Sequence, residues 1–139
     1  MKIDRFEDLE VWKHARRLAN LVYRLTGKSL LARDFGLRDQ MRRAAVSIMS
    51  NIPEGFESRT RAMFVEYLGR SKGSAGELRA QLYLASDQAY VTESEFRQAY
   101  DLAESCSKQL GGLIKYLESS SGARYSTRTG TCTPRKPGA

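Results

Sequence analysis

The stretch FVEYLGRSKGSAGELRAQLYLASDQA, residues 64–89, decides the fold of this chain. Its apolar and small residues recur at alternating steps of four and three, the spacing of an amphipathic helix in a bundle. They are Phe64, Leu68, Ser71, Ala75, Leu78, Leu82, Ala85 and Ala89. Thr60 is expected to cap the start of this helix. A glycine in a helix interior lowers helix stability by about 1 kcal/mol relative to alanine. Because close packing would offset this loss, Gly69, Gly73 and Gly76 predict the close approach of a neighbouring helix.

Two helices are expected before this stretch. Residues 8–25 carry a stripe at the same spacing, made of Val11, Ala15, Leu18, Val22 and Leu25. Gly27 follows it and is expected to end the helix in the left-handed conformation. Asp34 is the expected N-cap of the second helix, whose stripe runs Leu37, Met41, Ala44, Ile48 and then Asn51 or Ile52. Pro53 lacks a backbone donor, so we expect a kink or a stop there.

A fourth helix is expected from Thr92, which forms a capping box with Glu95. Its broad stripe contains Phe96, Ala99, Tyr100, Ala103, Cys106, Leu110, Leu113, Ile114 and Leu117. Four amphipathic helices joined by short loops predict an all-α protein, an antiparallel up-down four-helix bundle over residues 1–118. The last 21 residues, 119–139, hold 13 Ser, Thr, Gly or Pro residues and four basic ones without an acid. That composition predicts a disordered basic tail.

Several classes of protein do not fit this sequence. No apolar run approaches the roughly 20 residues of a membrane span, and the N-terminus is too acidic for a signal peptide, so we expect a cytoplasmic protein. The two cysteines, Cys106 and Cys132, cannot make a disulfide framework or a structural zinc site. The one histidine, His14, has no catalytic motif around it and is expected to be half-exposed. We therefore expect no enzyme activity and no cofactor.

The charge is uneven. The formal net charge is +7, 16 of the 23 basic residues are arginine, and residues 1–79 hold 16 basic against 10 acidic side chains. Arginine suits phosphate oxygens, so a basic half is typical of a protein that binds nucleic acid. The candidate phosphate ligands lie on the first two helices and are Lys13, Arg16, Arg17, Arg24, Arg38, Arg42 and Arg43. In the alternative reading, several of them pair with Glu10, Asp39 or Glu66 across subunits.

Polar residues adjoin the apolar stripes of the second and third helices. Asn51 falls in register with its stripe, Ser47 and Glu54 lie on the edge of that face, and Glu77 lies beside Leu78. Because a buried polar group needs partners, they predict a buried network that fixes helix register and includes Gln40 and one of Arg42 or Arg43. The alternative is a Glu54–Glu77 carboxylate pair for metal or acid–base work. Di-iron bundles need two Glu-x-x-His motifs, which this sequence lacks, so no metal is expected.

Apolar residues outside the core registers predict self-association, because a monomer would expose them as a patch. They are Leu9, Trp12, Leu21, Phe56, Tyr67 and Tyr83. The aromatic residues on or beside the stripes are expected to be core or subunit contacts rather than platforms for stacked bases. These are Trp12, Phe64, Tyr67, Phe96 and Tyr100.

Three stretches resemble a known family: FEDLEVWKHA (6–15), FGLRDQMRRAAVSIMSNIPEG (35–55) and GSAGEL (73–78). They are similar to the bacterial four-helix-bundle proteins encoded by intervening sequences of 23S rRNA genes, and the similarity covers residues 3–118. Met49 stands where that family often has proline, and Pro53 where it often has alanine. The polar signature that the resemblance marks is Gln40, Ser47, Asn51, Glu54, Gly55, Gly73, Ser74 and Glu77.

The resemblance implies a ring-shaped homopentamer. It also implies a relation to the accessory proteins of diversity-generating retroelements, pentameric bundles that work with a reverse transcriptase and bind nucleic acid. The sequence is therefore expected to encode a non-enzymatic, homo-oligomeric protein that binds nucleic acid, RNA rather than DNA given the family's genomic setting. The alternatives are an oligomeric scaffold for a protein partner such as a reverse transcriptase, and an enzyme that uses Glu54 and Glu77.

Overall fold

The structure is a computed structural model that describes residues 3–119. Its helices, in chain order, are η1 (Phe6–Asp8), α1 (Glu10–Thr26), η2 (Leu30–Arg33), α2 (Phe35–Phe56), α3 (Arg61–Asp87) and α4 (Glu93–Glu118), where η denotes a short 3₁₀ helix. No strand occurs in the described part of the chain. The tail expected over residues 119–139, with Cys132, lies outside the described residues apart from Ser119.

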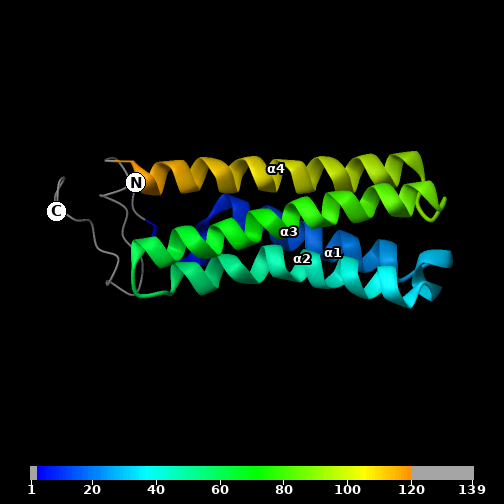
Figure 1. Cartoon of the computed structure of the whole chain (residues 1–139), viewed down its shortest axis with the longest axis horizontal. Helices are drawn as coiled ribbons and strands as arrows, with labels where there is room; N and C mark the ends of the chain where they lie inside the picture. The colour runs from blue at the N-terminus through cyan, green and yellow to red at the C-terminus, as the bar shows by residue number, and fades with distance from the viewer. Residues whose placement is uncertain (1–2, 120–139) are drawn as a thin grey trace.

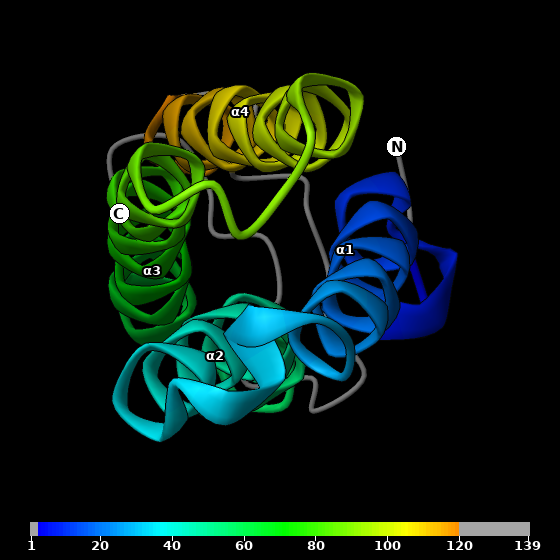
Figure 2. The ribbon, with the colours of Figure 1, turned by 90° about the vertical axis from the view of Figure 1, so that its right-hand side faces the viewer.

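The four long helices lie lengthwise beside one another and form a four-helix bundle (Figure 1). α1 and α2 are joined at the right-hand end of that view, α2 and α3 at the left-hand end, and α3 and α4 again at the right-hand end. Seen end-on, the helices occupy the corners of a square in chain order (Figure 2). α2 and α3 pack together most extensively, and α1 and α4 pack together least among the neighbouring pairs. None of the helices within residues 3–119 has the length and hydropathy needed to cross a membrane.

The predicted stripes form the core. Every stripe residue of α1 is buried, as are the seven stripe residues of α3 from Phe64 to Ala85. Ala89 is an exception, and its assignment to the stripe is wrong. α3 ends at Asp87, and Ala89 lies exposed in the following turn with φ 60°. A positive φ takes an alanine out of the helical conformation. The four-three spacing therefore extends in the sequence to a residue that lies after the end of the helix.

The predicted caps are confirmed. The Asp34 carboxylate accepts from the Leu37 N–H at 3.1 Å, the Thr60 hydroxyl accepts from the Met63 N–H at 3.1 Å, and both bonds of the Thr92 capping box are present. The left-handed end expected at Gly27 is wrong. Gly27 has φ −95° and closes α1 by donating its N–H to the Arg24 carbonyl at 3.3 Å.

Pro53 does not stop α2. The helix runs on to Phe56, and the Glu57 N–H donates to the Pro53 carbonyl at 2.9 Å. Proline costs the helix one backbone donor, whereas Ile52, Gly55 and Phe56 around it are all buried. Burial of this last turn therefore outweighs the lost hydrogen bond.

The close approach expected at the glycines of α3 is also wrong. Gly69 and Gly73 are exposed, and an added Cβ would meet nothing within 4 Å at either position. The tight contact between α2 and α3 is made instead by Gly55, where an added Cβ would lie 2.8 Å from the Cβ of Tyr67. The Ser71 hydroxyl also donates to the Ile48 carbonyl at 2.6 Å across this buried contact.

The right-hand end of the bundle is fastened by polar contacts. Lys28 forms an ion pair with Glu95 at 2.6 Å, and the Tyr90 hydroxyl donates to the Asp34 carboxylate at 3.0 Å. The Lys28 ammonium lowers the pKa of Glu95, and donation to Asp34 raises the pKa of the Tyr90 phenol. These contacts join the α1–α2 connection to the start of α4 and the α3–α4 connection to the start of α2.

Three of the six residues expected to drive self-association are buried within the chain itself. Leu9, Leu21 and Phe56 belong to the core, and only Tyr83, 53% exposed, is open to solvent as expected. Leu9 directly precedes α1, Leu21 lies within α1, and Phe56 is the last residue of α2. The large apolar side chains that are exposed among the described residues are Tyr23, Leu30, Phe35, Val46, Met63, Tyr83 and Leu84.

Candidate nucleic-acid interface

Four of the predicted phosphate ligands line one hollow. Lys13, Arg16, Arg17 and Arg24 project from α1 into a space of about 390 Å³ between α1 and α4. All four are exposed. The remaining lining residues are Trp12, Asn20, Leu21, Gln98 and Leu102, so no carboxylate belongs to the wall. We call this space the cationic hollow.

The position of these cations follows from the helical repeat. The α1 stripe from Val11 to Leu25 faces the core, and the helical repeat turns the four cations away from it, toward solvent. Lys13 has an exposed ion pair with Glu10 at 3.1 Å, a kind of contact that contributes little to stability. Arg17 and Arg24 form no ion pair within residues 3–119. Their charge is therefore available to an anionic partner.

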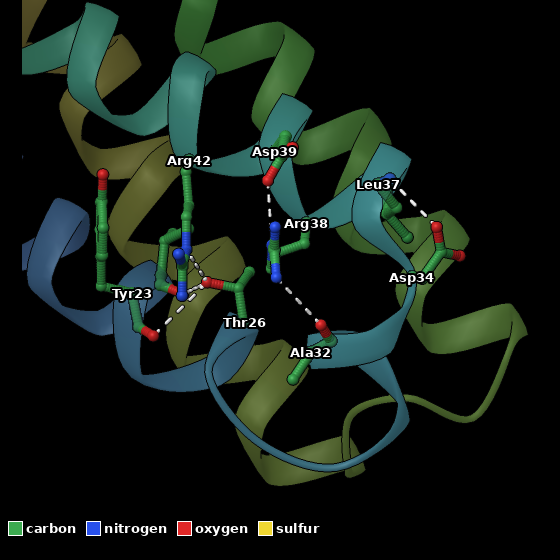
Figure 3. A network of polar contacts seen from close by, with 9 residues as sticks. Tyr23, Thr26, Ala32, Asp34, Leu37, Arg38, Asp39 and Arg42 are labelled. Atoms are coloured by element: carbon green, nitrogen blue, oxygen red, sulfur yellow. Dashed lines mark hydrogen bonds and ion pairs between the residues drawn. The ribbon is translucent and has the colours of Figure 1, made fainter.

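Arg42 has a different role, which Figure 3 shows. Its Nε donates to the Thr26 hydroxyl at 2.8 Å, and its guanidinium lies 4.5 Å from the centre of the Tyr23 ring. Thr26 is buried and in turn donates to the Val22 carbonyl at 2.6 Å. Arg42 thus connects the last turn of α1 to α2, and its guanidinium already contacts two residues of the same chain.

Arg38 is engaged in the same way (Figure 3). It donates to the Asp39 carboxylate at 2.9 Å and to the Ala32 carbonyl at 3.2 Å, and it lies 4.7 Å from the centre of the Phe35 ring. Arg43 is exposed on α2 and has no ion pair in the described part of the chain. The seven predicted ligands therefore divide into four that share the cationic hollow, two that hold the α1–α2 connection, and Arg43 alone.

The buried polar network is only partly present. Asn51 donates to the backbone carbonyl of Ser47 at 2.8 Å and to its hydroxyl at 2.9 Å, and Ser47 bonds Ser74 at 2.8 Å. These three side chains are half-buried, and Gly55 is buried. The four remaining members of the signature, Gln40, Glu54, Gly73 and Glu77, are exposed, so the prediction that Gln40, Glu54 and Glu77 join a buried network is wrong. All four lie on the exposed surface of α2 or α3.

No candidate metal centre forms in the described part of the chain. Across residues 3–119, no group of three or more His, Cys, Asp and Glu side chains could hold a metal ion. Nδ1 of His14 lies 2.9 Å from Nε2 of Gln109, between α1 and α4. Cys106 is buried, and burial raises the pKa of its thiol to about 11, which keeps it protonated and unreactive. Cys106 therefore acts as a packing residue, and His14 is half-buried, as expected.

The wall that α4 contributes to the hollow was missed from the sequence. Gln98 and Leu102 line it together with the α1 cations, but neither residue type signals a phosphate site. The roles of Tyr23 and Thr26 as partners of Arg42 were missed for the same reason, since they depend on the crossing of two helices.

These features define a class, the small four-helix bundles with a basic outer face. The sequence matches the family model of the 23S rRNA-intervening sequence protein over residues 7–112, and the chain belongs to that family. Comparison with curated proteins finds no match. Among solved structures, the chain is similar to a protein with unknown function from the S23 ribosomal protein family of Bacteroides thetaiotaomicron VPI-5482. The TM-score is 0.70 at 23% identity, over 76% of this chain and 98% of that one. This similarity concerns the fold alone.

Proposed function

We propose that this chain is a non-enzymatic bacterial cytoplasmic protein that binds RNA through the outer face of α1. The observation that carries the proposal is the cationic hollow, in which four basic side chains gather without a carboxylate in the wall. The family description, with its link to intervening sequences of 23S rRNA, favours RNA as the partner. Contacts of this kind recognise phosphate and give affinity with little sequence preference.

The proposal includes an assembly. The chain is an antiparallel up-and-down bundle that forms a ring-shaped homopentamer. Such a ring carries five cationic hollows, one from each copy. Two features of the described chain support an association between copies. Met63 exposes apolar surface near the start of α3, and Tyr83 and Leu84 expose it near the end of that helix.

Light scattering measures the assembly directly. One chain has a mass of 15.7 kDa, so a pentamer at micromolar concentration is expected at five times that value. A mass that stays at the single-chain value over a concentration series would contradict the assembly but leave the cationic hollow intact.

Salt dependence tests the RNA proposal. A fluorescent single-stranded RNA is titrated with the protein at about 50 and 200 mM salt, and its anisotropy gives the affinity. Each phosphate contact releases a counterion, so several contacts per site predict an affinity that falls by orders of magnitude between the two concentrations. Equal affinity at both salt concentrations would reject the electrostatic mechanism.

A second function has one observation in its favour. Leu30 and Phe35, at the α1–α2 connection, are 61% and 63% exposed, and exposed apolar side chains of this size are typical of protein contacts. They favour a scaffold that holds a protein partner, such as a reverse transcriptase, without direct RNA binding. Absence of RNA binding at the lower salt concentration would make this the better proposal.

A further inference from the structure

A second hollow lies on the other side of α1. It measures about 420 Å³, lies between α1 and α2, and is lined by Trp12, Arg16, Ala19, Asn20, Tyr23, Val46 and Met49. Trp12, Arg16 and Asn20 belong to both hollows. One side of α1 therefore offers four cations, and the other offers two aromatic rings and three apolar side chains together with the shared Arg16 and Asn20. We call the second space the aromatic hollow.

Trp12 was expected to be a core or subunit contact, but it lines an open hollow. We infer instead that the aromatic hollow receives unpaired bases of an RNA strand whose phosphates lie in the cationic hollow. The inference rests on the proposed function and specifies its ligand as single-stranded RNA. A nucleotide carries an anionic phosphate at one end and a flat apolar base at the other, so the paired hollows match its two parts. In a duplex the bases are stacked inside and cannot reach the rings, whereas a single strand can turn them outward.

The two rings are held in place before any ligand binds. Phe6 meets Trp12 edge-on, with ring centres 5.1 Å apart, and the Arg16 guanidinium lies 5.9 Å from the Trp12 ring centre. Arg42 supports Tyr23, which remains 47% exposed. Trp12 and Tyr23 are three helical turns apart, about 16 Å along α1, so the hollow can take more than one base. Ordered rings lose little conformational freedom when a base stacks on them.

Asn20 favours RNA over DNA in this arrangement. Its amide nitrogen donates to the Arg16 carbonyl at 2.9 Å, and its side-chain oxygen has no hydrogen-bond partner within residues 3–119. The residue lies between the two hollows, where the sugars of a bound strand would pass. There the oxygen can accept from a ribose 2′-hydroxyl, the group that distinguishes RNA from DNA.

Trp12 provides a direct test, because it is the one tryptophan in the chain. The full-length protein is titrated with three strands of equal length and phosphate number: oligouridylate, the same strand without bases, and oligodeoxythymidylate. We expect oligouridylate to quench Trp12 fluorescence and to bind about tenfold or more tightly than the abasic strand, since stacked bases add this much. The DNA strand is expected to bind more weakly than oligouridylate.

A matched pair of variants locates the effect. Tyr23→Leu removes a ring from the aromatic hollow, and Tyr83→Leu removes a ring of similar exposure from α3. After circular dichroism and thermal unfolding confirm that both variants are folded, Tyr23→Leu is expected to weaken oligouridylate binding about tenfold. It should leave abasic binding unchanged, and Tyr83→Leu should affect neither strand.

The possible failures are distinguishable. If the abasic strand binds as tightly as oligouridylate and Trp12 fluorescence is unchanged, the base site is wrong while the proposed function stands. If neither strand binds at about 50 mM salt, the proposed function fails and this inference fails with it. Tighter binding of the DNA strand would overturn the assignment to RNA.

Discussion

Reversal of Arg16, Arg17 and Arg24 to glutamate is expected to weaken RNA binding by about 100-fold or more at moderate salt. The variant loses three phosphate contacts together with their counterion release, and it places carboxylates where phosphates would lie. The slope of log affinity against log salt concentration should become shallower by about 2, since each contact to a single strand contributes roughly 0.7. Anisotropy titrations at several salt concentrations measure both quantities.

The control for this experiment has the same net charge. Arg33, Arg59 and Lys72 are exposed and lie outside the cationic hollow, so their reversal to glutamate should cost far less affinity. Arg38 and Arg42 are left unchanged in both variants because they bond within the chain, and their loss would confuse binding with folding. Equal losses from the two triple variants would show that general charge, and not the hollow, governs binding.

Gly55→Val is expected to give the largest loss of stability. The added Cβ would lie 2.8 Å from the Cβ of Tyr67 and 3.2 Å from the Phe64 carbonyl oxygen, and neither atom can move without moving α3. Overpacking of this kind costs about 1–3 kcal/mol and sometimes more. We expect a loss near the upper end, about 3 kcal/mol, because valine adds two methyl groups. Chemical denaturation followed by circular dichroism measures it.

Gly73→Val is the matched control. Gly73 also lies within a helix, but an added Cβ there meets no atom within 4 Å. Valine has a somewhat better helix propensity than glycine, so this variant should be as stable as the wild type or slightly more so. Both proteins are compared at one concentration, since an oligomer's stability depends on it. Wild-type stability in Gly55→Val would refute the tight contact between α2 and α3.

The sequence predicts the helices well because their signals are local. Asp34, Thr60 and Thr92 cap helices through residues three positions away, and the period of the apolar stripes is a property of a single helix. Predictions that needed two helices at once were less accurate. The small residues of α3 were expected to mark the close contact, yet only the crossing with α2 reveals that Gly55 makes it.

The candidate site was predictable to a similar extent. The spacing of the α1 cations put them on one face, and the fold then supplied α4 as the opposite wall. Arg38 and Arg42 look equivalent to those cations in the sequence, but η2 and the end of α1 bring a carbonyl and a hydroxyl within their reach. Glu54 was expected to join the buried network because it lies on the edge of the face that carries Asn51, but this edge position leaves its side chain exposed.

The connections at alternate ends have a consequence for any assembly. The described chain begins and finishes at the left-hand end in Figure 1, and the end fastened by Lys28 and Glu95 lies opposite. In a ring of copies with parallel long axes, one rim would therefore carry residues 3 and 119 of every copy, and the other rim would carry every fastened connection. Labels attached to the first and last described residues would mark the same rim, and a partner that binds one rim would not contact the other.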